Sequence, residues 1–123
     1  MTVPVRAVAT SLLDDVAKGS SLNKIFSRAE RSVADSERPL LRELVYGTLR
    51  LWPLYKGVTR QILERPLKTK DAVLEALLIM AMYELDECAT PDYASVSRAV
   101  DCCEQLERPW ANRLINGCLR RYQ

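Results

Sequence analysis

Two arginines end the two copies of a short motif in this chain. The motif reads Leu-(Val/Ile)-x-Gly-x-Leu-Arg and occupies residues 44–50 and 114–120. Its last residue is Arg50 in the first copy and Arg120 in the second. A guanidinium group presents a planar fork of N–H donors that pairs with a phosphate through two parallel hydrogen bonds. Arg50 and Arg120 are therefore candidate phosphate-binding residues, although an arginine in the last turn of a helix also interacts favourably with the helix carbonyls.

Further basic residues extend this candidate set. They are Arg42 and Arg113, which lie just upstream of the two copies, Arg121, which follows the second copy, and Arg6, near the N-terminus. Residues 108–123 carry 4 basic and no acidic side chains, whereas residues 67–107 carry 3 basic and 9 acidic ones. This polarity predicts a basic face that meets an anionic partner, and a chance asymmetry of a solvated surface is the alternative.

Each copy of the motif also has a glycine inside an apolar helical pattern, Gly47 in the first and Gly117 in the second. A glycine within a helix costs about 1 kcal/mol relative to alanine. We therefore expect both glycines to let their helices approach another backbone closely, and we expect Gly117→Leu to destabilise the fold. Asn116 lies beside Gly117, and we expect it to bond to the first motif helix or to contact the anionic partner.

The chain offers little for catalysis or metal binding. It has no histidine, and its glycines are too far apart to form a phosphate-binding loop. The four cysteines include no Cys-x-x-Cys pair, so neither a catalytic site nor a metal site is expected. Cys118 has arginines nearby that favour a thiolate, but its apolar helical phase predicts a buried structural role instead. Cysteines in this pattern are typical of a reducing cytoplasm.

Two tryptophans, Trp52 and Trp110, lie beside prolines at predicted helix starts. Such positions often hold a hydrophobic contact across the first turn, so we expect both rings to pack in or near the core rather than to stack on unpaired bases. No apolar run approaches the roughly 20 residues of a membrane span, and the N-terminal segment lacks the pattern of a secretory signal. The sequence therefore predicts a cytoplasmic protein without a membrane partner.

Prolines and apolar residues at helical spacing divide the chain into seven segments. The segments cover about residues 3–18, 22–33, 36–51, 53–63, 70–86, 92–106 and 109–122. The fifth segment is the most apolar, which predicts the central helix of the fold. No stretch alternates with a period of two residues, so no strand is expected. We therefore expect an all-α bundle of about seven helices, in which residues 1–123 form one domain of two pseudo-repeated halves.

These motifs resemble a known family. Residues 38–50 closely resemble the signature helix of NusB-like domains, in the form that is fused to ribosomal RNA cytosine-C5 methyltransferases. Residues 114–120 resemble the second signature of the same domain, and Ala81-Met82-Tyr83-Glu84-Leu85 is similar to its central helix. The resemblance covers nearly the whole chain and implies an all-helical domain with two roughly equivalent halves.

The resemblance implies an RNA-binding domain that helps to position 16S ribosomal RNA for methylation by a catalytic domain absent from this chain. That catalytic domain would use S-adenosylmethionine, so no cofactor and no enzyme activity are implied for the chain itself. The implied partners are small-subunit ribosomal RNA and a methyltransferase domain of the same parent protein, with a ribosomal protein as a further candidate. A free-standing antitermination factor of the NusB type and a protein-docking module without RNA binding are the alternatives. The antitermination form opens with an arginine-rich segment, whereas residues 3–9 contain only Arg6, which favours the methyltransferase-associated form.

Overall fold

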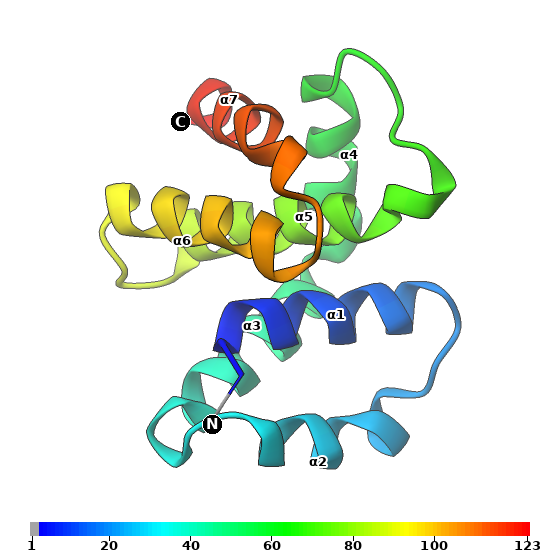
Figure 1. The fold of residues 1–123 in the computed structure, drawn as a ribbon, viewed down its shortest axis with the longest axis vertical. Helices are drawn as coiled ribbons and strands as arrows, with labels where there is room; N and C mark the ends of the chain where they lie inside the picture. The colour runs from blue at the N-terminus through cyan, green and yellow to red at the C-terminus, as the bar shows by residue number, and fades with distance from the viewer. Residues whose placement is uncertain (1–2) are drawn as a thin grey trace.

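Prolines and short turns divide the chain into seven α-helices in the computed structural model, which describes residues 3–123 (Figure 1). The helices are α1 (Val5–Ala17), α2 (Leu22–Ser32), α3 (Arg38–Arg50), α4 (Trp52–Ile62), α5 (Ala72–Glu87), α6 (Asp92–Gln105) and α7 (Asn112–Tyr122). Three-residue 3₁₀ turns lead into α3, α5 and α7. The predicted third, fifth and seventh segments begin within these turns, so each starts a few residues before its α-helix. The described residues contain no strand, so the predicted all-α fold is confirmed.

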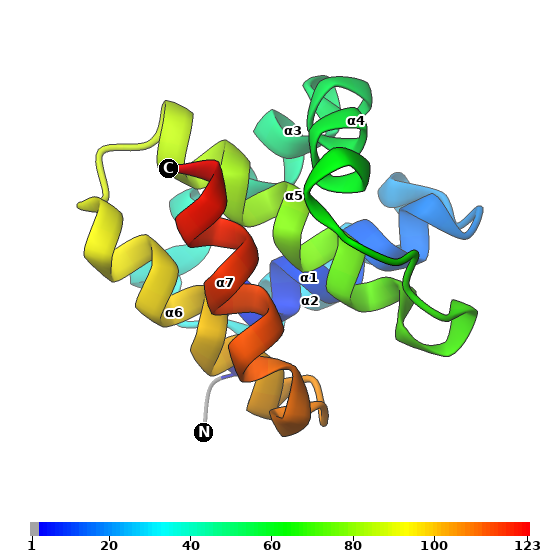
Figure 2. The ribbon, with the colours of Figure 1, turned by 90° about the horizontal axis from the view of Figure 1, so that it is seen from above.

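Helix α5 runs through the middle of the molecule (Figure 2). Eleven of its 16 residues are buried, so it is covered on nearly all sides rather than along a single apolar stripe. It packs against α1, α3, α4, α6 and α7, which confirms the predicted central helix. At 16 residues α5 is shorter than the roughly 20 residues of a membrane span. No helix of residues 3–123 is both long enough and apolar enough to cross a membrane.

The two copies of the motif occupy different halves of the bundle. Figure 1 shows α1, α2 and α3 together in its lower half, with α4, α6 and α7 above them. Helix α3 packs mainly on α1, and helix α7 packs mainly on α6, while both also contact α5. Each half therefore contributes one motif helix to the cover of α5.

A buried ion pair joins α1 to α5. The Nε atom of Arg6 lies 2.9 Å from Oε1 of Glu84, and a second hydrogen bond joins Nη2 to Oε2. Arg6 is 7% exposed and Glu84 is 1% exposed. The hydrogen bonds to Glu84 raise the pKa of Arg6 against the opposing effect of burial. The structure therefore places Arg6 in the core rather than on the predicted basic face, because its guanidinium is enclosed and its charge is neutralised by Glu84.

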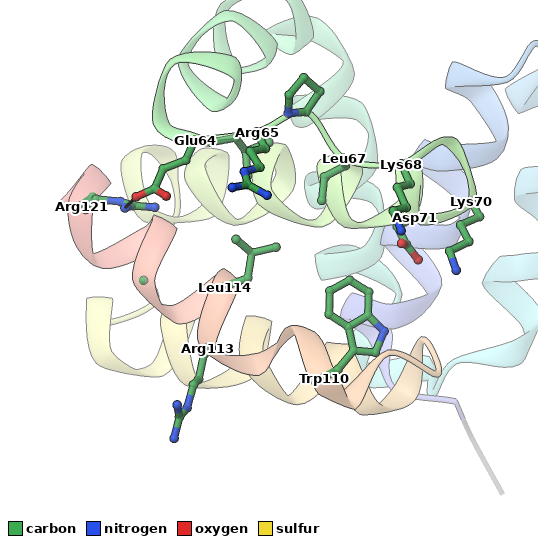
Figure 3. Close-up of a pocket in the computed structure, with 13 residues that line it drawn as sticks. Glu64, Arg65, Leu67, Lys68, Lys70, Asp71, Trp110, Arg113, Leu114 and Arg121 are labelled. Atoms are coloured by element: carbon green, nitrogen blue, oxygen red, sulfur yellow. Dashed lines mark ion pairs between the residues drawn. The ribbon is translucent and has the colours of Figure 1, made fainter.

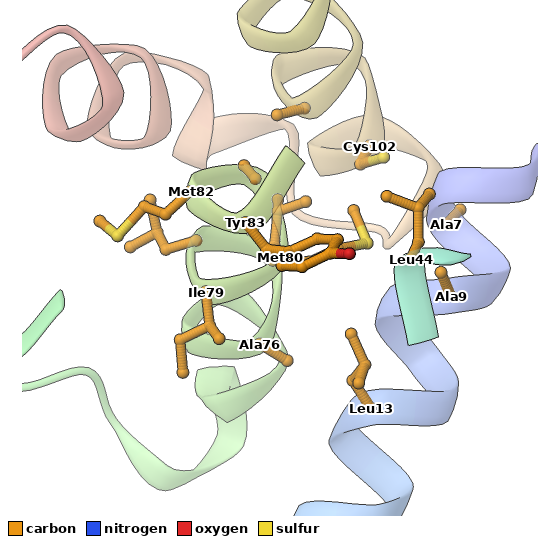
Figure 4. Close-up of a cluster of buried hydrophobic side chains, with 14 of the residues drawn as sticks. Ala7, Ala9, Leu13, Leu44, Ala76, Ile79, Met80, Met82, Tyr83 and Cys102 are labelled. Atoms are coloured by element: carbon orange, nitrogen blue, oxygen red, sulfur yellow. The ribbon is translucent and has the colours of Figure 1, made fainter. Parts of the chain in front are cut away.

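Gly47 lies where α3 meets Tyr83 of α5. Figure 4 shows the Tyr83 ring extending from α5 toward the segment that carries Leu44. A Cβ atom at position 47 would collide with the hydroxyl and the ring of Tyr83, and that ring is only 1% exposed and cannot swing into solvent. Gly47 therefore lies at a close contact, but the predicted partner was wrong: the neighbour is a tyrosine side chain rather than the backbone of another helix.

Gly117 lies in a different environment. A Cβ atom built on it would have no neighbour within 4 Å among the described residues beyond its own helix backbone. Gly117 borders an open groove rather than a packed helix contact. The prediction of a close approach at Gly117 is therefore wrong, and with it the expected destabilisation by Gly117→Leu, because the space beside this residue is free.

The contrast between the two glycines predicts opposite effects of the same substitution. We expect Gly117→Ala to raise the free energy of unfolding by about 0.5–1 kcal/mol, because alanine is the better helix former and nothing obstructs its methyl group. We expect Gly47→Ala to lower it by about 1–3 kcal/mol, because the methyl group overpacks the core at Tyr83. Urea unfolding followed by circular dichroism measures both changes. Equal effects of the two substitutions would contradict the assigned roles.

The ion pair between Arg6 and Glu84 predicts a non-additive pair of substitutions. We expect Arg6→Met to lower the free energy of unfolding by about 3–5 kcal/mol, because it leaves the Glu84 carboxylate buried without its partner. The double variant Arg6→Met/Glu84→Met removes both charges, so we expect it to be more stable than Arg6→Met alone. Arg31→Met, at an exposed position of α2, is the control and should unfold like the parent chain. A double variant that is less stable than the single one would show that the pair is not the source of the effect.

Candidate nucleic-acid interface

Three of the candidate arginines are free on the surface. Arg50, Arg113 and Arg120 are exposed, and none of them forms an ion pair with a carboxylate within residues 3–123. Arg50 ends α3, whereas Arg113 and Arg120 lie on α7. An exposed guanidinium without an acidic partner is available to an anion from solution. The structure thus leaves these three as candidate phosphate-binding residues.

Two other candidate arginines already have partners. Arg42 Nε lies 2.7 Å from Oε2 of Glu30, and the guanidinium lies over the Phe26 ring, 5.2 Å from its centroid. These two contacts hold Arg42 against α2. Arg121 Nη1 lies 3.5 Å from Oε1 of Glu64, whose side chain is 85% exposed. An exposed pair of this kind contributes at most about 1 kcal/mol, so Arg121 can exchange Glu64 for a phosphate oxygen while Arg42 is more firmly held.

Asn116 acts within its own helix. Its Oδ1 atom accepts a hydrogen bond of 3.2 Å from Nε of Arg120, one turn further along α7. This bond uses only one of the five N–H donors of the guanidinium, so the terminal amino groups stay available. The structure therefore corrects the expected contact of Asn116 with the first motif helix, and it gives Asn116 the role of orienting Arg120.

The apolar spacing of α7 decides which side chains face outward. Ile115, Cys118 and Leu119 are buried, in positions three and four residues apart that face α5 and α6. Arg113 and Arg120 occupy the remaining phases and are exposed. Because the last 16 positions contain no acidic residue, α7 itself contributes only positive charge to this outer face. One helix therefore contributes both to the core and to a positively charged surface.

A groove of about 760 Å³ separates α7 from the segment 63–71, which joins α4 to α5 (Figure 3). Trp110, Leu114, Gly117 and Arg121 line it from the α7 side, and their spacing of four, three and four residues is that of one helix face. The opposite wall comes from the segment itself and includes three cations, Arg65, Lys68 and Lys70.

The groove contains residues that the sequence reasoning did not select. Arg65, Lys68 and Lys70 were not candidates, although the run of three cations around Pro66 is a local basic signal. Trp110 is 61% exposed, so the prediction that it packs in or near the core is wrong. The 3₁₀ turn Pro109–Ala111 directs Ala111 inward instead and leaves the indole outside. Trp52 is half-buried against the core, as predicted.

The cysteines are placed as structural residues. Burial raises the pKa of Cys102 to about 12 and the pKa values of Cys88 and Cys103 to about 11, which keeps these thiols protonated. Cys118 is buried in the core. Within residues 3–123 no group of cysteine, aspartate and glutamate side chains is arranged to hold a metal ion. The chemistry that the described surface offers is positive charge beside an exposed aromatic ring.

Comparisons with known proteins agree on one family. Residues 3–123 match the NusB family. The chain is 32% identical over 123 residues to ribosomal RNA small subunit methyltransferase B of Yersinia enterocolitica, a match that covers 99% of this chain. Proteins of the same name from Yersinia pseudotuberculosis and Yersinia pestis match it equally, at 32% identity over 99% of the chain. The chain spans 29% of the length of these relatives. Because the family match covers nearly the whole chain, this protein belongs to the NusB family.

Proposed function

We propose that this chain is an RNA-binding domain that helps to position small-subunit ribosomal RNA for cytosine-C5 methylation by a catalytic domain outside the chain. The observation that carries the proposal is the basic outer face of α7, with Arg113 and Arg120 exposed and unpaired within residues 3–123. Arg50 adds a further phosphate contact at the end of the other motif helix. A ribosomal RNA partner also implies a cytoplasmic location.

The charges on this face suit a phosphate backbone. Arginines on a rigid helix neutralise phosphates and release their counterions, which supplies most of the affinity of sequence-independent RNA binding. The core positions of α7 fix the direction of these arginines, and Asn116 holds the Arg120 side chain. Pre-positioned side chains lose less conformational freedom when they bind. The face is therefore suited to hold an RNA backbone in a defined orientation.

The similarity to methyltransferases supports the second part of the proposal. Proteins named ribosomal RNA small subunit methyltransferase B contain a segment that matches this chain at 32% identity, and the segment is 29% of their length. The remaining length of such a relative is ample for a catalytic domain. We infer that residues 1–123 act as one domain that presents the RNA, while methyl transfer occurs elsewhere in the parent protein.

The residues of this chain do not fit S-adenosylmethionine, the cofactor of the implied methyltransferase. A nucleotide-type cofactor is usually held by a glycine-rich turn between a strand and a helix. The described residues form helices without strands, and the four glycines lie on separate elements at positions 19, 47, 57 and 117. No step of methyl transfer is therefore assigned to this chain.

Docking of the catalytic domain is a second candidate function. Tyr93 is 80% exposed and Leu54 is 59% exposed, on α6 and α4 respectively. Large exposed apolar side chains of this kind are common at the centres of protein interfaces. Docking and RNA binding are compatible, because these side chains belong to α6 and α4 whereas Arg113 and Arg120 belong to α7.

RNA binding predicts a specific dependence on salt and on two arginines. We expect the chain to bind a fragment of small-subunit ribosomal RNA, with an affinity that falls steeply between a low and a high salt concentration. Arg113→Ala and Arg120→Ala should each weaken binding and reduce the slope of log affinity against log salt by about one, because each removes one phosphate contact. Fluorescence anisotropy with labelled RNA measures the affinity and the slope.

A control variant separates this face from general positive charge, and a further variant tests Arg50. Arg31→Ala removes another exposed arginine, on α2, and should leave the affinity nearly unchanged. Arg50→Ala should weaken binding if the first motif contributes its proposed contact. The RNA proposal fails if the chain does not bind the fragment, or if Arg31→Ala weakens binding as much as Arg113→Ala and Arg120→Ala do.

A further inference from the structure

A groove of about 530 Å³ lies between α1, α2 and the residues that end α6. Its apolar lining comes from all three helices, with Ala7 and Leu12 on α1, Ile25 and Ala29 on α2, and Leu106 directly after α6. We call this surface the α1–α2 groove. It belongs to a different part of the bundle from α7, so the basic face described above does not account for it.

Helix α2 is covered on only one side. Figure 1 shows it at the edge of the molecule, with α1 between it and α5. Of its 11 residues only Phe26 is buried, while Leu22, Ile25 and Ala29 are half-buried. The spacing of these three residues places them on one apolar stripe, which in most helices faces a core. Two of them line the α1–α2 groove, so an apolar occupant would remove this surface from water.

The walls of the α1–α2 groove determine which backbone form can occupy it. Its two long walls are helices, whose backbone N–H and C=O groups are bonded within each helix. An extended segment in the groove would therefore bury backbone groups without partners, whereas a helix satisfies its own. The small side chains of Ala7 and Ala29 leave room for another helix to lie close to both walls. The groove thus favours a helical occupant with one apolar face.

The α2 side of the groove carries unpaired positive charge. Lys24 and Arg28 line the groove one turn apart, and Arg31 follows in the next turn; we call these three residues the basic edge. All three are exposed, and none forms an ion pair within residues 3–123. Glu30, the acidic residue of α2, is held by Arg42 at 2.7 Å. The basic edge therefore favours carboxylates on the occupant.

We propose that the α1–α2 groove docks an acidic amphipathic helix of another protein, with its apolar face on Ile25 and Ala29 and its carboxylates along the basic edge. Carboxylates at positions i, i+4 and i+7 of the docked helix match the spacing of the three cations. The opposite wall carries the exposed carboxylate of Asp15, so acidic residues are favoured on one side of the docked helix only. The proposal does not depend on RNA binding, because its residues belong to other helices than α7.

The test uses the whole chain and a fluorescein-labelled peptide of about 18 residues, long enough to form a helix on binding. Leucines form one face of the peptide, and glutamates at i, i+4 and i+7 form one edge. In one control peptide lysine replaces each glutamate, and in a second the same residues are reordered so that the leucines share no face. Anisotropy is measured at two salt concentrations. We expect the glutamate peptide to bind roughly tenfold more tightly than either control, and more weakly at high salt.

Reversing the charge of the basic edge tests the contact directly. We expect Lys24→Glu/Arg28→Glu to weaken binding of the glutamate peptide roughly tenfold and to make the lysine peptide the tighter ligand. Both side chains are exposed, so the variant should keep the parental thermal unfolding curve. Gain of lysine-peptide binding is a result that loss of the fold cannot produce. Lys68→Glu/Lys70→Glu changes the net charge equally in segment 63–71 and should bind the glutamate peptide like the parent.

Other occupants of the groove give different results. Equal affinity of the parent chain for the glutamate peptide and for either control peptide contradicts the proposal. If the ribosomal RNA fragment displaces the peptide, and the charge reversal weakens RNA binding as much as Arg113→Ala does, the basic edge belongs to an RNA surface instead. If the chain alone sediments as a dimer that the reversal dissociates, the groove holds a second copy. Peptide binding without any RNA binding supports this proposal while the proposed function fails.

Discussion

The fold depends on a helix that is buried on nearly every side. Between Val73 and Glu84 nearly every residue of α5 is buried, so an ionised side chain there needs a partner from a surrounding helix. Glu84 receives that partner from α1, in Arg6. Near the end of α5, Asp86 accepts hydrogen bonds from Tyr55 of α4 and Tyr122 of α7. The polar residues of α5 thereby fix the positions of three neighbouring helices.

The basic surface of α7 follows from this arrangement. Burial and the hydrogen bond to Asp86 raise the pKa of Tyr122 to about 12, so this hydroxyl remains a donor and ties the last turn of α7 to α5. The apolar face of α7 packs inward, and its arginines are directed outward as a consequence. The groove lies between segment 63–71 and α7. Gly117 of α7 lines it without a side chain, so the space beside this residue is free. The placement of α7 therefore accounts for its apolar contact with the core, for the outward direction of its arginines and for the groove beside Gly117.

Much of the fold could be predicted from sequence because it depends on local periodicity. Apolar spacing located all seven helices, and the unusual apolar content of residues 72–87 identified the central one. The candidate arginines were harder to judge, since charge alone does not show which partners the fold supplies. Arg6 lies in a basic N-terminal region, yet it is enclosed by contact with a carboxylate 78 positions away. Such a long-range pair leaves no signal in the spacing of residues.

The two glycines and the two tryptophans show the same limit. Gly47 and Gly117 occupy equivalent motif positions, but only the first faces a bulky side chain, because α3 and α7 have different neighbours. Trp52 and Trp110 both lie beside prolines, but the turn before α7 directs the second ring into solvent. Lys68 and Lys70 were not selected because they lie in a stretch that is acidic on average, residues 67–107. Of the carboxylates in that stretch only Asp71 lines the groove, and it is paired with Arg108. In each case the neighbours that the tertiary structure supplies, rather than the local sequence pattern, determine whether the residue is packed or exposed.

The contact between Gly47 and Tyr83 has a consequence for how the two positions vary during evolution. Both residues occupy one volume of the core, so a side chain at position 47 fits without a packing cost only where the side chain at position 83 is smaller than that of tyrosine. We therefore expect substitutions at these two sites to be coupled rather than independent. Position 117 is under no such packing constraint, because the space beside it is free.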